Sequence, residues 1–223
     1  MNIGIFASGR GSNFIAILRA IEEGRLAARI GVVISNKADA GALLAARAQN
    51  IPAYHISPPA YGEQSEDDYV AAVRQVLYRH QIDFIALAGY LKKLPAAIVR
   101  EFRNRIVNIH PALLPSFGGK GMYGIHVHEA VLEAGVKVTG VTVHLVDEEY
   151  DHGPIVLQRA VEVHDDDTPE TLAQRVLQVE HELYPEALQL FAEGRIRVDH
   201  GRVFCLAGES SRSAPPVAVK GVK

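Results

Sequence analysis

The sequence predicts an α/β fold: a Rossmann-like, mainly parallel sheet with helices on both faces and an antiparallel C-terminal extension. The first half alternates short, unbroken apolar runs with segments of helical period, which is typical of parallel strands covered on both faces. In the second half two strand-like runs are separated only by residues 147–153, too few for a helical crossover. With 48% hydrophobic and 22% charged residues, the 223-residue chain can form an ordinary globular core.

Five strands separated by helices are expected in the parallel part. The strands are the apolar runs 2–7, 28–35, 53–56, 83–88 and 106–109. The helices are the segments with apolar residues at helical spacing, at 14–21, 41–49, 65–80 and 95–102.

The second half of the chain predicts the antiparallel extension. Strands are expected at 138–146 and 154–163, and a terminal hairpin at 195–198 and 203–206. A long helix is expected to begin after Thr168, a suitable N-cap, and to end at Gly194. Pro169 fits the first helical position, and Glu170 complements the helix dipole.

Charge and cysteine content exclude several function classes. The net charge of −3 and the pI near 6.4 give no basic surface for a nucleic-acid backbone or an anionic membrane. A single cysteine, Cys205, excludes an internal disulfide framework, and with no adjoining base motif its thiol is expected to be inert. The N-terminus lacks the basic segment of a secretory signal. We therefore expect a cytoplasmic protein that acts on small molecules as a monomer or homodimer.

A glycine cluster, Gly9 and Gly11, lies between the first strand and the first helix. Backbone N–H groups at such a helix start can bind a phosphate. A dinucleotide-binding loop requires a third glycine, at the position that Phe14 occupies here, and an acidic residue near the position of Ser35. Both are missing, so NAD is not expected. A tight turn without a ligand explains the glycines equally well.

A second candidate site lies at the end of the fifth strand, in Asn108-Ile109-His110-Pro111. Residues two apart in a strand face the same side, so Asn108 and His110 project together at the edge where open α/β sheets bind ligands. The imidazole titrates near neutrality, and the amide can donate to an oxyanion. A purely structural role for the pair is the competing interpretation.

The acidic segment 147–154 ends in Asp151-His152-Gly153-Pro154. Acidic loops are usually solvated turns, and most of these carboxylates are expected to be so. The rigid ending would hold Asp151 where it could meet His110, and a carboxylate beside a histidine favours the imidazolium. His126, His128 and His144 could instead join His110 around zinc, but without a His-x-x-x-His spacing this is the weaker hypothesis.

Taken together, the motifs resemble those of the folate-dependent formyltransferases. The matching segments follow in order at 8–13, 35–37, 87–90, 108–115, 143–144, 151–154, 180–181 and 184–185. The motifs Asn-x-His-Pro and Asp-x-Gly-Pro are shared across that family. The Gly-Ser-Asn loop points to the members that formylate glycinamide ribonucleotide in purine synthesis.

The resemblance implies transfer of a formyl group from 10-formyltetrahydrofolate, the co-substrate, to a primary amine. Asn108, His110 and Asp151 match the family's catalytic trio. Asn108 and protonated His110 would stabilise the tetrahedral oxyanion, and Asp151 would keep His110 charged and relay protons. No metal and no covalent intermediate is required.

The resemblance also implies the binding residues. Gly11, Ser12 and Asn13 would hold the phosphate of glycinamide ribonucleotide, and Glu180 would bind its ribose side. Two segments would wrap the pterin, largely through backbone groups, and supply Tyr90, Leu91, Lys92, Lys93, Leu94, Asp147, Glu148, Glu149 and Tyr150. The loop 118–124 is longer than in some members, which leaves its contacts open.

Three alternatives are weighed against this interpretation. Formyltetrahydrofolate hydrolases carry an N-terminal sensor domain, for which the strand expected at 2–7 leaves no room. Methionyl-tRNA formyltransferases need a C-terminal RNA-binding domain and a basic face. A non-catalytic folate- or nucleotide-binding module would not need all three polar groups of the trio. We therefore expect one formyltransferase domain over residues 1–207 and a flexible tail over 208–223.

Overall fold

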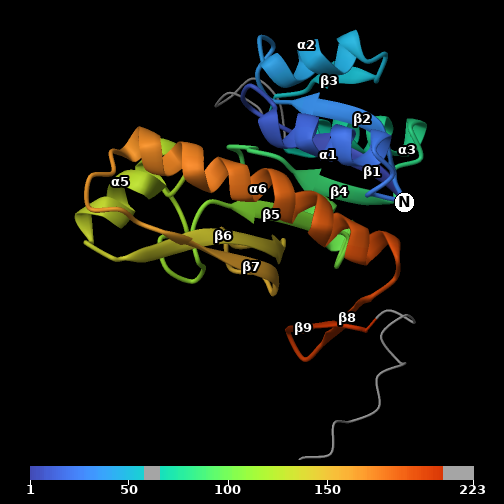
Figure 1. The fold of residues 1–223 in the computed structure, drawn as a ribbon. Coiled ribbons are helices and arrows are strands. Elements are labelled where there is room, and N and C mark those ends of the chain that lie inside the picture. Colours follow the sequence, from blue (N-terminus) through green and yellow to red (C-terminus); the bar gives the residue numbers. More distant parts are fainter. Residues whose placement is uncertain (58–65, 208–223) are drawn as a thin grey trace, which may run out of the picture.

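The computed structural model describes residues 1–57 and 66–207. Its centre is a seven-stranded sheet with the strand order β3-β2-β1-β4-β5-β6-β7, and β8 and β9 form a separate two-stranded sheet (Figure 1). The tail expected over 208–223 lies outside the described residues.

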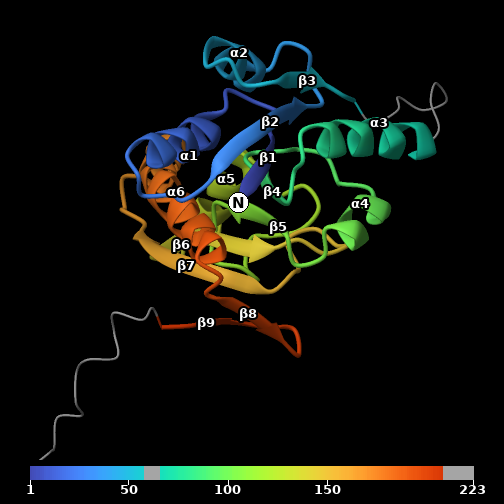
Figure 2. The same cartoon turned by 90° about the vertical axis from the view of Figure 1, so that its right-hand side faces the viewer.

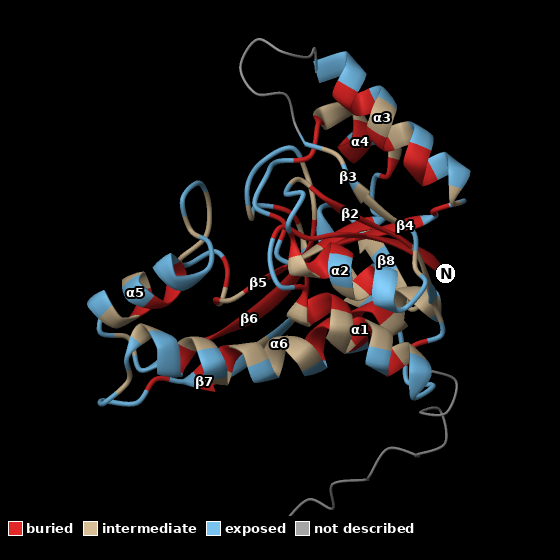
Figure 3. Cartoon of the chain, turned by 90° about the horizontal axis from the view of Figure 1, so that it is seen from above, coloured by how far each residue is buried: buried red, intermediate tan, exposed pale blue. Residues whose placement is uncertain are grey.

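The first five strands are parallel, as the apolar runs predicted. They are β1 (Asn2–Phe6), β2 (Arg29–Ser35), β3 (Ala53–His55), β4 (Phe84–Leu87) and β5 (Ile106–His110). Every residue of β1 and β4 is buried, which is why these runs contain no alternating polar positions (Figure 3).

The antiparallel extension is also present. Its strands are β6 (Val138–Leu145), β7 (Ile155–Glu162), β8 (Ile196–Asp199) and β9 (Arg202–Cys205). Strand β6 pairs with β5 so that His144 lies opposite Asn108 and Thr142 lies opposite His110. The predicted fold class is therefore confirmed.

Helices cover both faces of the sheet (Figure 2). On one face lie α1 (Ser12–Glu22), α2 (Gly41–Ala48) and α6 (Pro169–Ala192), and on the other lie α3 (Glu66–Arg79) and α4 (Ala96–Glu101). Phe14 and Leu183 belong to the first hydrophobic core, and Val73 and Ile98 to the second. Within the described residues, no helix is long and apolar enough to span a bilayer.

One helix, α5 (Ile125–Glu133), is missing from the sequence prediction. Its start carries no usual signal, because the N-cap is Gly124 and no side chain forms a cap hydrogen bond. Its buried apolar residues are Val127 and Val131, and Leu132 packs half-buried against the core. The segment also contains His126, which the sequence analysis treats as a candidate metal ligand.

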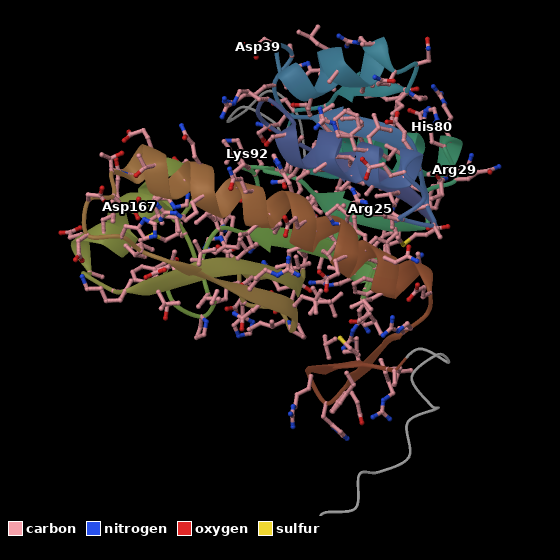
Figure 4. The ribbon with its side chains drawn as sticks, viewed as in Figure 1. Arg25, Arg29, Asp39, His80, Lys92 and Asp167 are labelled. Atoms are coloured by element: carbon pink, nitrogen blue, oxygen red, sulfur yellow. The ribbon has the colours of Figure 1, made fainter. Side chains whose placement is uncertain are left out.

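The long helix α6 begins as predicted after Thr168. The Thr168 side chain accepts from the N–H of Thr171, and the Thr171 hydroxyl accepts from the N–H of Thr168. Asp167, labelled at this end of the helix in Figure 4, accepts two hydrogen bonds of 2.7 Å from Arg175. The helix start is therefore fixed by side chains on both sides of the cap.

The sheet has a topological switch point between β1 and β4. From β1 the chain builds outward to β2 and β3, and then crosses back to place β4 on the other side of β1. Ligands of open α/β sheets bind at the carboxyl edge near such a point. The segments that leave β1 and β4 meet there, since the N–H of Ser8 donates to the carbonyl of Gly89 at 3.0 Å.

Tyr184 fixes α6 to the middle of the sheet. Its side chain is fully buried, and its hydroxyl lies 2.9 Å from the carbonyl oxygen of Leu87 and 3.1 Å from that of Val107. These carbonyls belong to β4 and β5, the strands that end at the switch-point edge. One hydroxyl thus links the helix to both strands.

We expect Tyr184→Phe to lower the free energy of unfolding by about 1–2 kcal/mol, because two buried carbonyls lose the single hydroxyl hydrogen that they share. Urea denaturation followed by circular dichroism measures this loss. Tyr78→Phe is the control, since the exposed Tyr78 hydroxyl donates to Glu101 at the surface. An equal loss in the two variants would contradict the role of Tyr184 as the link between α6 and the central strands.

Candidate active site

A cavity of about 360 Å³ opens at the carboxyl edge of β4 and β5. Its lining comes from four stretches of chain, which lie within 87–94, 108–111, 119–124 and 144–151. Three of these stretches were expected from the motifs. The stretch 119–124 is new as part of the site.

Strand β5 positions Asn108 and His110 together in the cavity wall. They are alternate residues of the strand, so they face the same side. The turn that follows is held by the hydroxyl of Thr142, which donates to the carbonyl of Ala112 (2.6 Å) and accepts from the N–H of Leu114 (3.0 Å). The Pro-x-Leu-Leu-Pro segment is thereby tied to β6.

The structure brings Asp151 to this pair from a separate loop. Asp151 Oδ2 lies 3.6 Å from Nδ1 of His110, and Oδ1 lies 3.6 Å from Nε2 of His144. The backbone of Asp151 has a φ of 51°, a left-handed conformation that Asp and Asn tolerate better than most residues. At Gly153 a Cβ atom would lie 1.9 Å from the carbonyl of Leu145, so only glycine fits there.

The Asp151 carboxyl is ionised at neutral pH. Burial opposes its ionisation, but the neighbouring His144 and His110 and a 2.9 Å hydrogen bond from the N–H of Gly119 outweigh burial and lower the pKa of Asp151. A single negative charge is therefore held among polar groups in a site that excludes most solvent.

His110 has a defined protonation pattern. Its Nε2 lies 2.8 Å from the carbonyl oxygen of Phe117, which can only accept, so Nε2 carries a hydrogen. Nδ1 then faces Asp151. Burial lowers the pKa of His110, and the opposing effects of the Asp151 charge and the Phe117 carbonyl do not overcome it. The expectation that Asp151 keeps His110 charged therefore needs correction: Asp151 raises the pKa, but burial favours the neutral imidazole more strongly.

His144 is a site residue that the motifs did not assign to the catalytic group. Its Nδ1 lies 2.9 Å from the carbonyl of Leu145, which can only accept, so Nδ1 carries a hydrogen. Its Nε2 lies 3.1 Å from the amide nitrogen of Asn108 and 3.6 Å from Oδ1 of Asp151. The Asn108 amide also donates to Oδ1 of Asp151, at 3.4 Å. The strand register reveals this contact; the position of His144 in the sequence does not.

The segment 117–119 holds the site through its backbone. The carbonyl of Phe117 accepts from the imidazole described above, and the N–H of Gly119 donates to Asp151. At Gly118 a Cβ atom would lie 3.2 Å from the Cβ of Asp151, tighter than ordinary contact. Gly118 therefore allows a close backbone approach to Asp151.

Most residues expected around the pterin line the cavity. They include all residues from Tyr90 to Leu94, among them Lys92, labelled in Figure 4. Asp147, Glu149 and Tyr150 line it as well, and the Lys93 ammonium lies 5.7 Å from the centroid of the Tyr150 ring. Glu148 does not line this cavity, and its carboxylate pairs with the guanidinium of Arg100 at 2.7 and 2.9 Å.

The expected phosphate loop is the N-terminal end of α1. Gly11 is the N-cap and has a φ of 83°, and the helix start has no side-chain cap hydrogen bond. Glycine is required at this position also because a Cβ atom would lie 2.8 Å from that of Ala42 on α2. Ser12 is the first helical residue. The backbone N–H groups at this end remain suitable for an anion.

Asn13 and Glu180, both expected to bind substrate, contact each other. The Asn13 amide donates to the Glu180 carboxylate at 2.6 Å. Burial raises the pKa of Glu180, and the hydrogen bond from Asn13 opposes this only partly. Neither residue lines the cavity around His110. The structure therefore holds two neighbouring groups of candidates, and not one merged pocket.

The zinc hypothesis gains no support from the geometry. Across residues 1–57 and 66–207, no group of three or more His, Cys, Asp or Glu side chains is arranged to hold a metal ion. His126 instead pairs with Glu129 at the surface, and His128 is buried on α5.

Comparisons with known proteins agree with the fold. A family model described as formyl transferase matches residues 1–188. The chloroplastic phosphoribosylglycinamide formyltransferase of Arabidopsis thaliana is 46% identical over 195 residues, which cover 87% of this chain and 66% of that protein. This chain belongs to the formyl transferase family. It spans just under two thirds of the plant relative's length.

Two solved structures share the fold. Glycinamide ribonucleotide transformylase 1 from Symbiobacterium toebii superposes with a TM-score of 0.85 at 44% identity, covering 93% of this chain and 94% of that one. A formyltetrahydrofolate deformylase from Pseudomonas syringae pv. tomato superposes with a TM-score of 0.82 at 28% identity, covering 92% and 66% respectively. The fold alone is thus compatible both with formyl transfer and with removal of the formyl group from the folate.

We expect Asp151→Asn to reduce turnover by at least ~10², the usual scale of a lost acid–base contribution. Asparagine tolerates the same left-handed backbone, so the variant removes mainly the charge. That charge raises the pKa of His110, so the pKa falls further in the variant and the imidazolium forms only at lower pH. Turnover across pH and an NMR titration of His110 measure both effects.

Glu148→Gln is the control in the same loop. It removes a carboxylate that pairs with Arg100 outside the cavity, so turnover and the His110 titration should remain close to wild type. Equal losses in the two variants would show that the loop responds to any lost charge, and Asp151 would have no special role.

Proposed function

We propose that the protein transfers the formyl group of 10-formyltetrahydrofolate to the primary amine of glycinamide ribonucleotide. The family membership and the names of the similar proteins support this activity. We further propose that residues 1–207 act as one formyltransferase unit.

The observation that carries the proposal is the convergence of Asn108, His110 and Asp151 on one cavity wall. An amide donor, an imidazole and a carboxylate are the groups that acyl transfer to an amine requires. Residues of the segments 90–94 and 147–151 line the same cavity, which supports their role as the walls around the folate. A cavity of this size suits the bulk of a pterin ring.

The ribonucleotide would bind at the neighbouring group of candidates. Its phosphate fits the uncapped helix start at Gly11, Ser12 and Asn13, where backbone N–H groups and the helix dipole favour an anion. Glu180 would accept from ribose hydroxyls while it remains bonded to Asn13. The amine would then reach the formyl group across the switch point between β1 and β4.

In the first step the amine nitrogen attacks the formyl carbon, and a tetrahedral oxyanion forms. Asn108 and His110 would donate to that oxygen, each donor being worth about 3–4 kcal/mol in comparable sites. Both donors already have acceptors, so the oxygen must replace them. The 3.4 Å contact from Asn108 to Asp151 is the longest and the easiest to exchange.

In the second step the bond from the carbon to the folate nitrogen breaks. The amine loses one proton and the leaving nitrogen gains one. Asp151, ionised and within 3.6 Å of His110, would relay this proton. The low pKa of His110 suits this role, because a neutral imidazole can take up a proton during the reaction.

Hydrolysis of the same folate is the second candidate, because the deformylase shares this fold. A water-using enzyme has no need of a phosphate-binding helix start, and this feature favours the transferase. The deciding assay mixes the protein with 10-formyltetrahydrofolate, with and without glycinamide ribonucleotide, and follows tetrahydrofolate. We expect product only with the ribonucleotide. Equal rates without it would replace the transferase by the hydrolase.

We expect Asn13→Ala to raise the KM for the ribonucleotide while the KM for the folate changes little, because Asn13 lies outside the folate cavity. Steady-state constants for both substrates measure the effect. If Asn13→Ala changed only the KM for the folate, the separate placement of the ribonucleotide site and the folate site would be wrong.

A further inference from the structure

Ser8 is a buried polar residue to which neither the motifs nor the mechanism gives a role. It directly follows Ala7 at the carboxyl end of β1, and it is only 2% exposed. Because β1 and β4 flank the switch point, Ser8 lies between the proposed ribonucleotide site and the proposed folate site.

The Ser8 hydroxyl forms two hydrogen bonds with fixed directions. Its single hydrogen goes to the side-chain oxygen Oδ1 of Asn36, which can only accept. Its oxygen accepts from the backbone N–H of Leu91 at 2.8 Å. The hydroxyl thus joins the end of β2 to the segment after β4.

These contacts connect the two proposed binding segments. Leu91 belongs to the segment 90–94 that lines the folate cavity, and Ser8 lies three residues before Gly11 in the phosphate loop. The main chain adds a hydrogen bond from the N–H of Ser8 to the carbonyl of Gly89. Ser8 therefore contacts both loops, and its hydroxyl forms the side-chain link between them.

We infer that Ser8 is a positioning residue that couples ribonucleotide binding to folate binding. The inference rests on the proposed function for the identity of the two ligands. With the ribonucleotide phosphate on the helix start, the β1 loop is held in place, and the Ser8 oxygen holds Leu91 and the folate wall in turn. Coupling of this kind is reciprocal: each ligand must tighten the other by the same factor.

Ser35 offers a matched control. It is a fully buried serine near the carboxyl end of β2, and its oxygen also accepts from a backbone N–H, that of Lys37 at 3.1 Å. This bond stays within one segment and does not cross the switch point. Ser35→Ala therefore removes a buried hydroxyl of the same kind without breaking the link between the loops.

The test measures binding of tetrahydrofolate by calorimetry, with and without saturating glycinamide ribonucleotide, so that no turnover occurs. We expect the ribonucleotide to tighten folate binding in the wild type and in Ser35→Ala. In Ser8→Ala, folate binding in the ternary complex should weaken about fivefold, the scale of one lost hydrogen bond, and the tightening should shrink accordingly. Asn36→Ala, which leaves the oxygen of Ser8 in place but removes its acceptor, should reduce the tightening less.

The outcomes separate the inference from the proposed function. Unchanged coupling in Ser8→Ala, or no coupling in the wild type, overturns the inference and leaves the proposed function standing. Failure of the wild type to bind either ligand overturns the proposed function and the inference with it. If Ser8→Ala does not fold, Asn36→Ala decides, because Asn36 lies at the surface edge of the same contact; full coupling in that variant overturns the inference.

Discussion

The arrangement of the site depends on keeping one carboxylate charged in a largely buried place. Asp151 loses much of its hydration, and the structure compensates with hydrogen bonds from the N–H of Gly119 and the amide of Asn108. The two histidines that lie 3.6 Å from its carboxylate are themselves fixed: His110 by the carbonyl of Phe117, and His144 by that of Leu145. Removing one support would therefore leave the others with unmatched partners, and the cluster behaves as a unit and not as separate residues.

Much of the fold could be predicted from local patterns. Unbroken apolar runs identify the buried parallel strands, and the short connection 147–153 indicates that the sheet continues in antiparallel fashion. Both follow from side-chain burial and chain length, which are properties of the sequence itself. Helix α5 (Ile125–Glu133) could not be predicted, because its cap is a glycine and only a short part of it is buried. It packs against α6, a tertiary contact that no local pattern encodes.

The candidate site also combines features that local sequence patterns predict with features that depend on tertiary structure. Asn108 and His110 share a strand, so their common orientation follows from the period of two. The contact of His144 with Asn108 depends on which residues of β5 and β6 face each other, and this register is a tertiary property. The orientation of Glu148 depends on the position of Arg100 on α4, far away in sequence. The protonation of His110 depends on burial, which no motif encodes.

Helix α6 (Pro169–Ala192) carries Glu180 and Tyr184 one turn apart on the same face. The tyrosine joins the helix to the carbonyls of two central strands, and the glutamate holds Asn13 at the proposed phosphate loop. Helix α6 therefore contributes both to the core and to the wall of the proposed substrate site. Selection for a different nucleotide could not shift Glu180 along the sheet without also disturbing the packing of the molecule's centre. In this scaffold, changes of specificity are accordingly expected to arise in the loops, while the helix stays in place.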